Sequence, residues 1–211
     1  MSGGRIALIV FGCLVGLIGL ALLIAGAVGL WAHTSLRDDD GYYTSDSERL
    51  ETPLRALVTE NLDLGDIPSG DDFWASLRIT AERPDGGPIF LGVGPRAQVQ
   101  RFLAGVPHAV ITDLDFDPFR ATYAPRLGRR LPEPPGGEAF WAAQASGPGE
   151  QTLTWDVEDG NWQIVAMNPD GSPGVVIDTT AGVKISWLLG LTIGALVLGV
   201  LLLGGGVTMV V

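Results

Sequence analysis

The chain has 211 residues and a net charge of −11, with 24 acidic residues, 13 basic residues and one cysteine. This acidic balance argues against a nucleic-acid-binding protein, and a single cysteine excludes a disulfide within the chain. Arg5 is the only charged residue outside positions 37–184, so this central segment has 12 basic residues against 24 acidic ones, a net charge of −12. Its length suffices for one core and is too short for two domains.

The first expected element is a transmembrane helix within residues 1–33. Residues 6–32 contain no Asp, Glu, Lys or Arg, and about 20 helical residues suffice to cross the hydrocarbon core of a bilayer. A secretory signal is the alternative, with Ala25-Gly26-Ala27 as its cleavage site, but its apolar region would be only about 7–15 residues long. Cys13 lies inside the span and is expected to pack as a small apolar residue.

Residues 34–184 predict a mainly β fold: a single antiparallel β-sandwich-like domain with one short helix, or an open barrel. In a polar lead-in, Ser45 and Glu48 are expected to cap one helical turn. The elements expected after it are strands at 73–81, 89–93 and 109–116, a helix that begins at Pro95 and stops at Gly105, a Pro- and Arg-rich loop at 125–137, and four short strands.

A β-hairpin is expected among these last strands, across residues 153–166. Asp159-Gly160 is a favoured two-residue turn. The resulting register pairs Trp155 with Ile164 and places Trp155 and Trp162 on the same apolar face. Burial of both rings in the core is favoured, and an exposed stacking platform for a sugar is the alternative.

The last expected element is a second transmembrane helix, residues 185–211, which again contains no charged residue. Arg5 favours a cytoplasmic amino terminus, and therefore a domain outside the cytoplasm on a protein with two spans in the cell membrane. About five residues then precede the first span and none follow the second. No cytoplasmic domain is expected, and the protein is expected to act through partners in the membrane or outside it.

Four glycines of the spans are candidates for helix packing. Gly12 and Gly16 have the spacing GxxxG, and so do Gly190 and Gly194. Small residues at this spacing allow two membrane helices to approach closely. Contact between the two spans, or between a span and a partner, is therefore expected at these positions.

A cation site is a further hypothesis, at Asp113, Asp115 and Asp117. These carboxylates occupy the odd positions of a calcium-binding loop, which would then need Gly and, at its twelfth position, Glu. The chain has Pro118 and Ala124 there. The favoured interpretation is a strand with its carboxylates on the solvated face.

The segment from Gly92 to Ala97 has the glycine spacing of a dinucleotide-binding turn, and Asp113 follows at the distance of a ribose-binding acid. Its antiparallel context and short helix favour a tight turn that leads into the helix. An anion at the helix start is a lesser possibility.

The remaining candidates carry no diagnostic motif. His108 has no nucleophile or acid at a diagnostic spacing, so no catalytic residue and no cofactor is predicted. Trp74 faces away from the apolar side of its strand and is a candidate for an exposed contact. Arg126, Arg129 and Arg130 are expected to pair with acids of the domain, with lipid headgroups as the alternative.

Two segments resemble a group of actinobacterial membrane proteins with two terminal spans and a β-rich domain outside the cytoplasm. They are PIFLGVGPRAQVQRFLAGVPHAVITDL and FWAAQASGPGEQTLTWDVEDGNWQIVAMNPDGSPG, and the likeness covers most of the chain from Ala56 onward. The resemblance implies the architecture and a cell-envelope location. It carries over no activity, substrate or site residue.

These features predict a non-enzymatic, membrane-anchored interaction module, for example an accessory subunit of a membrane or cell-envelope complex. Its expected partners are the lipid bilayer and a membrane or envelope protein or a second copy of the chain, and nucleic acid is not expected. The alternatives are a domain that binds a carbohydrate or a cation, an envelope enzyme and a pore-forming oligomer.

Overall fold

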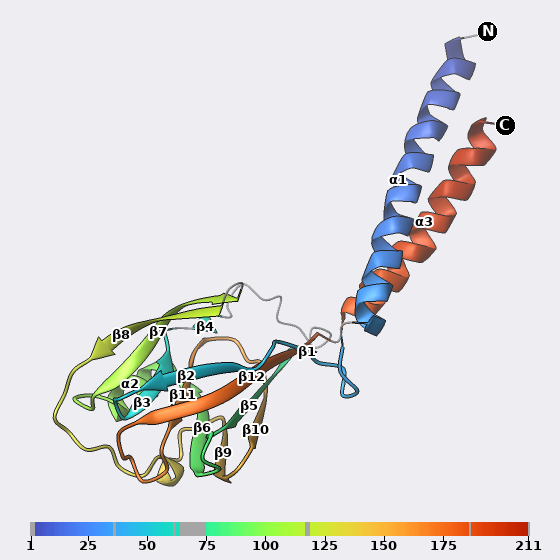
Figure 1. The fold of residues 1–211 in the computed structure, drawn as a ribbon. Coiled ribbons are helices and arrows are strands. Elements are labelled where there is room, and N and C mark those ends of the chain that lie inside the picture. The colour runs from blue at the N-terminus through green and yellow to red at the C-terminus, as the bar shows by residue number, and fades with distance from the viewer. Residues whose placement is uncertain are drawn as a thin grey trace. The chain divides into compact units, whose positions relative to one another are not determined.

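The computed structural model describes residues 3–35, 37–60, 62–63, 75–116, 119–185 and 187–210. The chain divides into two compact units. One combines residues 1–43 with residues 185–211 and is helical, and the other comprises residues 44–184 and is rich in strands (Figure 1).

The helical unit consists of α1 (Gly3–Ser35) and α3 (Leu188–Val210), which lie side by side (Figure 1). Val10–Ala32 has a mean hydropathy of 2.6 and Leu189–Thr208 has one of 2.1. Both segments are long and apolar enough to cross a membrane, although a signal sequence near the amino terminus has the same character.

Two β-sheets form the second unit. The first has the order β1–β12–β5–β10, with β2 also paired to β12. Its strands are β1 (Tyr43–Thr44), β2 (Glu48–Thr52), β5 (Ala75–Glu82), β10 (Gln151–Asp156) and β12 (Val175–Ile185). The second has the order β8–β7–β3–β11–β6–β9, with β4 paired to β11. Its strands are β3 (Ala56–Thr59), β4 (Leu62–Asp63), β6 (Pro88–Pro95), β7 (His108–Phe116), β8 (Phe119–Arg126), β9 (Ala143–Pro148) and β11 (Asn161–Met167).

The two sheets share one apolar core. Ile79 and Leu153 of the first sheet are buried in the same cluster as Leu57 and Leu91 of the second. Alternation along each strand sends every second side chain into this cluster, as in β10, where Leu153 and Trp155 are buried and their neighbours are exposed. Burial of apolar surface between the sheets is therefore the main force that holds them together.

A second core lies on the other face of the second sheet. Helix α2 (Arg96–Phe102) covers this face and buries Val99 and Phe102 against Phe90 and Met167. Pro95 precedes the helix, and Gly105 follows it with φ of +74°. The expected helix and the strands at 89–93 and 109–116 are thus confirmed.

The expectation that every strand pair is antiparallel is wrong at one place. β3 and β7 are parallel, with Leu57 opposite Ala109 and Val58 opposite Val110. The intervening chain contains β4, β5, β6 and α2, and it returns to the end of the sheet where β3 began. A parallel pair needs such a long crossover, and residue alternation within single strands does not reveal it.

The expected hairpin at residues 153–166 is also wrong. β10 pairs with β5 in the first sheet, whereas β11 pairs with β3, β4 and β6 in the second, so Asp159-Gly160 lies in a connection between sheets. The face assignment is nevertheless confirmed. Trp155 and Trp162 are 5% and 8% exposed, and their ring centroids lie 4.9 Å apart across the shared core. This burial removes the basis for a sugar platform.

The polar lead-in contains strands instead of a capped helical turn. Glu48 begins β2, which pairs with β12. The Ser45 hydroxyl accepts a hydrogen bond from the backbone N–H of Ala181, and the Ser45 N–H donates to the Ala181 carbonyl. Pairing with a strand distant in sequence therefore overrides the local capping signal.

Candidate functional site

A groove of about 380 Å³ lies beside α2 on the surface of the strand-rich unit. We call it the α2 groove. Its lining combines two aromatic rings with charges of both signs: Gln98, Arg101, Phe102, Arg130, Glu133, Glu138 and Phe140. Only α2 and the segment that follows β8 contribute to it, so two parts of the chain that are distant in sequence build the groove.

Arg130 attaches the segment after β8 to the end of α2. Its Nε donates to the Ala104 carbonyl at 2.7 Å and its Nη2 donates to the Phe102 carbonyl. Its backbone N–H donates to the Gly105 carbonyl at 2.9 Å. Carbonyls at a helix end lack helical partners and favour a cation, so one arginine both caps α2 and positions a wall of the groove. The expected pairing of this arginine with an acid is therefore wrong.

Aromatic packing makes the floor of the groove rigid. The Phe140 ring lies 5.9 Å from the Phe102 ring and 4.3 Å from the Trp141 ring. Trp141 contacts Phe90 of β6 and donates its indole N–H to the Pro135 carbonyl at 2.8 Å. Tilted aromatic contacts at these distances stabilise one arrangement of the rings.

The segment beside the groove also carries two exposed leucines. Leu127 is 86% exposed and Leu131 is 66% exposed, on either side of Arg129 and Arg130. β8 runs antiparallel to β7, and β7 runs parallel to β3. The leucines therefore lie beyond the carboxyl end of β8, at the end of the sheet where β3 begins.

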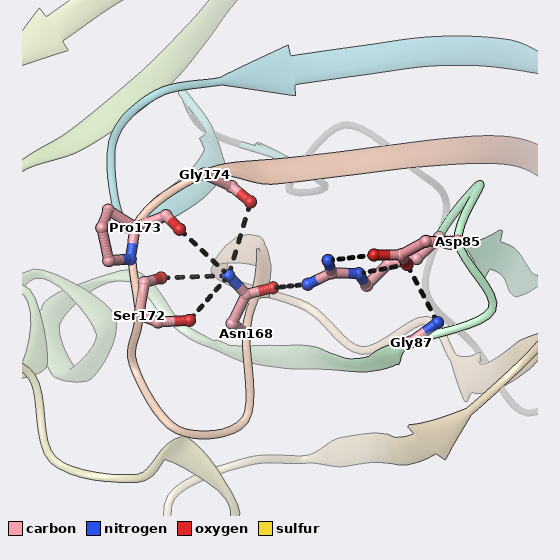
Figure 2. A network of polar contacts seen from close by, with 7 residues as sticks. Asp85, Gly87, Asn168, Ser172, Pro173 and Gly174 are labelled. Carbon is pink, nitrogen blue, oxygen red and sulfur yellow. Dashed lines mark hydrogen bonds and ion pairs between the residues drawn. The ribbon is translucent and has the colours of Figure 1, made fainter.

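The same end of the two sheets is joined by a polar network that contains a buried asparagine. Asn168, 3% exposed, follows β11, and Arg83 follows β5. Arg83 Nη1 donates to Asn168 Oδ1 at 2.7 Å. Figure 2 shows the amide nitrogen of Asn168 directed at the turn formed by Ser172, Pro173 and Gly174.

Asp85 completes this network from the exposed side. Its carboxylate accepts bonds from Arg83 Nε at 2.9 Å and from Arg83 Nη2 at 2.7 Å. It also accepts the Gly87 N–H at 2.9 Å (Figure 2). Chiefly through the Arg83 hydrogen bond, these contacts lower the pKa of Asp85 to about 2. The arginine is thereby held in the direction of Asn168, and the network has a structural role.

Asn168→Ala is expected to lower the free energy of unfolding by about 1–3 kcal/mol, because the Arg83 donor and the turn carbonyls lose the buried amide that pairs with them. Pulse proteolysis of the full chain in urea measures the change. Ser172→Ala is the matched control: it removes one Asn168 acceptor, the Ser172 hydroxyl, and leaves the backbone acceptors. A loss as large for Ser172→Ala as for Asn168→Ala would contradict the central role of the amide.

Glycines of the helical unit allow α1 and α3 to pack closely. Only some of them are the glycines expected from the sequence. A Cβ on Gly206 would lie 2.6 Å from the Gly12 carbonyl and 2.7 Å from the Gly16 nitrogen. The backbone of Gly12 and Gly16 therefore lies against α3 at Gly206, although a Cβ added at Gly16 itself would meet no atom within 4 Å. Around Gly190 and Gly194 no described atom lies within 4 Å of an added Cβ, so α1 does not reach them. Their contact with a partner stays a prediction.

α1 and α3 also approach closely at two other glycines. A Cβ on Gly19 would lie 2.6 Å from the Leu203 nitrogen, and one on Gly199 would lie 2.9 Å from the Gly19 carbonyl. Backbone atoms cannot move aside as a side chain can, so only glycine allows this separation.

The structure describes two of the three residues of the expected cation site. Asp113 is exposed on β7, opposite Thr122, and Asp115 stands opposite Arg120 in the backbone register of the β7–β8 pair. Asp117 lies outside the described residues, as does Trp74. Within the described ranges, no group of three His, Cys, Asp or Glu side chains could hold a metal ion. The cation site stays a prediction.

The dinucleotide hypothesis is wrong. Gly92 and Gly94 lie within β6, and α2 begins directly after Pro95, without a phosphate-binding loop. A Cβ on Gly92 would lie 2.7 Å from the Trp141 ring, and one on Gly94 would lie 3.1 Å from the Phe140 ring. These glycines therefore make room for the aromatic floor of the α2 groove.

His108 makes a local hydrogen bond, with Nδ1 donating to the Val106 carbonyl at 2.8 Å. Burial lowers the pKa of His108, the bond to Val106 opposes this shift, and the nearby Arg126 lowers the pKa further.

Neither the comparison with protein-family models nor the comparison with curated proteins finds a match for this chain. Function must therefore be argued from the surfaces described above. Sequence reasoning missed the α2 groove. Its one local signal was a pair of leucines in a loop that is otherwise rich in Pro, Gly and charged residues.

Proposed function

We propose that the chain is a membrane-anchored interaction module that binds a partner protein through the α2 groove and the adjacent leucines. In this proposal α1 and α3 span the cell membrane, and a β-sandwich-like domain lies outside the cytoplasm. The partner is another membrane or cell-envelope protein. An accessory subunit of a larger complex fits this arrangement.

The observation that carries the proposal is the exposure of Leu127 and Leu131 beside the groove. Both leucines belong to the segment that supplies Arg130 to the groove, and large apolar side chains exposed next to an aromatic groove favour a surface that a partner covers. Arg101, Arg130, Glu133 and Glu138 surround the aromatic floor. An apolar centre with a charged rim is the usual anatomy of a protein–protein interface.

The position of this surface supports the same conclusion. β12 continues toward α3 from one end of the strand-rich unit, where the carboxyl end of β3 also lies. The leucines lie at the opposite end. The surface is therefore clear of the strand through which the chain continues to α3.

Photo-crosslinking in intact cells tests the partner. A photoreactive phenylalanine derivative in place of Gln98 is expected to form a discrete adduct with one protein upon illumination. Leu127→Asp combined with Leu131→Asp should abolish this adduct, because two carboxylates would enter an apolar contact. The matched control places the same probe at Thr154, on the exposed face of β10. Failure of the leucine variant to reduce the adduct would contradict the proposal.

Cysteine labelling tests the topology. Asp170 is exposed in the turn after β11, so Asp170→Cys is expected to react in intact cells with a maleimide that does not cross membranes. The unmodified chain is the control, since its one cysteine, Cys13, lies in α1. Reaction only after lysis would place the domain in the cytoplasm.

A further inference from the structure

We propose that the space between the two sheets binds the end of a hydrocarbon chain, such as a lipid acyl chain. A cavity of about 140 Å³ lies there, separate from the α2 groove. Ten of its twelve lining residues are Leu, Ile or Ala, and the other two are Thr59 and Thr179. The lining carries no charge.

Both threonine hydroxyls already have partners within the fold. Thr59 Oγ1 accepts the backbone N–H of Ile164 at 2.9 Å, and Thr179 Oγ1 donates to the Thr80 carbonyl at 2.9 Å. Neither hydroxyl therefore needs a hydrogen bond from a ligand. A cavity of this kind selects an apolar ligand and excludes a sugar or an ion, for which desolvation would not be offset.

Among the described lining residues, burial decreases toward one end of the cavity. Along β5 the lining changes from buried Ile79 to half-buried Leu77, and along β12 it changes from buried Ile177 to exposed Ala181. β3 and β11 show the same gradient toward Thr59 and Ile164. On four strands from both sheets, the lining thus becomes more exposed toward the same end of the unit, where β12 finishes. We call this end the mouth of the cavity.

The size of the cavity limits the length of chain that fits. An engineered apolar cavity of about 150 Å³ in another protein holds benzene, so this cavity accommodates about six carbons. An empty apolar void of this size is destabilising, and water gains no hydrogen bonds in it. The terminal segment of an acyl chain supplies the missing contacts.

A source of acyl chains lies close by along the sequence. α3 begins at Leu188, only seven residues after Ala181 at the mouth. If α3 spans a bilayer, lipid hydrocarbon is available within a short length of chain from the mouth. A bilayer lipid is therefore the occupant to which the proposal commits.

Photolabelling in lipid vesicles tests this site. The full chain is reconstituted with a trace of a phospholipid that carries a diazirine at the end of one acyl chain, and adducts are mapped by mass spectrometry. Labelling of α1 and α3 provides the internal reference. Adducts are also expected in β5, β11 and β12, at Leu77, Ile164 or Ile177.

In Ala166→Phe the new ring fills the cavity from its wall. This variant is expected to reduce the adducts in the strands about tenfold. Exclusion of about two methylene groups of the acyl chain from the cavity is enough to lower the affinity by that factor. Labelling of α1 and α3 should not change. Ala181→Trp blocks the mouth at an exposed position, and it tests the same site if the first variant does not fold. Thr154→Trp, on the outer face of β10, is the matched control.

The proposal is overturned if the strands of the wild-type chain acquire no adduct. It is equally overturned if the adducts persist undiminished in both Ala166→Phe and Ala181→Trp. A decrease of the same size in Thr154→Trp would also contradict it, because that ring lies outside the cavity.

Discussion

Trp162→Ala is expected to lower the free energy of unfolding by about 3–5 kcal/mol, the usual range for truncation of a large buried aromatic residue. The ring is 8% exposed, packs 4.9 Å from Trp155, and donates its N–H to the Glu158 carbonyl at 3.0 Å. Removal leaves a cavity in the core that the two sheets share. Pulse proteolysis of the full chain in urea measures the loss.

The control for this prediction is Thr154→Ala, on the exposed face of β10. It is expected to change the free energy of unfolding by no more than about 0.5 kcal/mol. A loss below about 1 kcal/mol for Trp162→Ala would mean that the ring does not belong to the shared core.

Gly199→Ile is expected to separate α1 from α3. A Cβ at this position would lie 2.9 Å from the Gly19 carbonyl, and a branched side chain adds further clashes. Cys13 and Val207 line the same groove between the two helices, so a short bismaleimide should join Cys13 to the thiol introduced by Val207→Cys. Gly199→Ile should reduce this crosslink about tenfold, which corresponds to about 1.4 kcal/mol of lost pairing.

Gly194→Ile provides the matched control in the same helix. The space around Gly194 is open, so the crosslink should form as in the parent chain. An undiminished crosslink in Gly199→Ile would show that the two helices do not pair through this glycine.

Those parts of the fold that depend only on residues close together in the sequence were predictable. Uncharged runs predicted α1 and α3, and Pro95 with Gly105 marked the limits of α2. The burial of Trp155 and Trp162 was expected from the apolar face of the predicted hairpin, and it is found although the hairpin itself is wrong. Residue alternation reports which face of a strand is buried, and it is therefore reliable for single elements.

The pairing of strands could not be predicted in the same way. Alternation in β10 and β11 is equally compatible with one hairpin and with two strands that face each other from different sheets. Likewise, the glycine pattern in β6 has its cause about 50 residues later, in the rings of Phe140 and Trp141. The α2 groove was missed for the same reason, because its two walls meet only in the folded chain.

The pairing of β2 with β12 has a consequence for the order of events during synthesis. Leu50 stands opposite Ile177, 127 positions later in the chain. At roughly 5–20 residues per second, a ribosome needs on the order of ten seconds to make the intervening segment. During that interval β2 lacks the strand to which it forms hydrogen bonds, and its apolar side chains have no partner to pack against. The first sheet therefore closes only when its last strand is made, shortly before α3 follows. Until then the nascent chain has an unpaired strand edge that requires protection from misassembly.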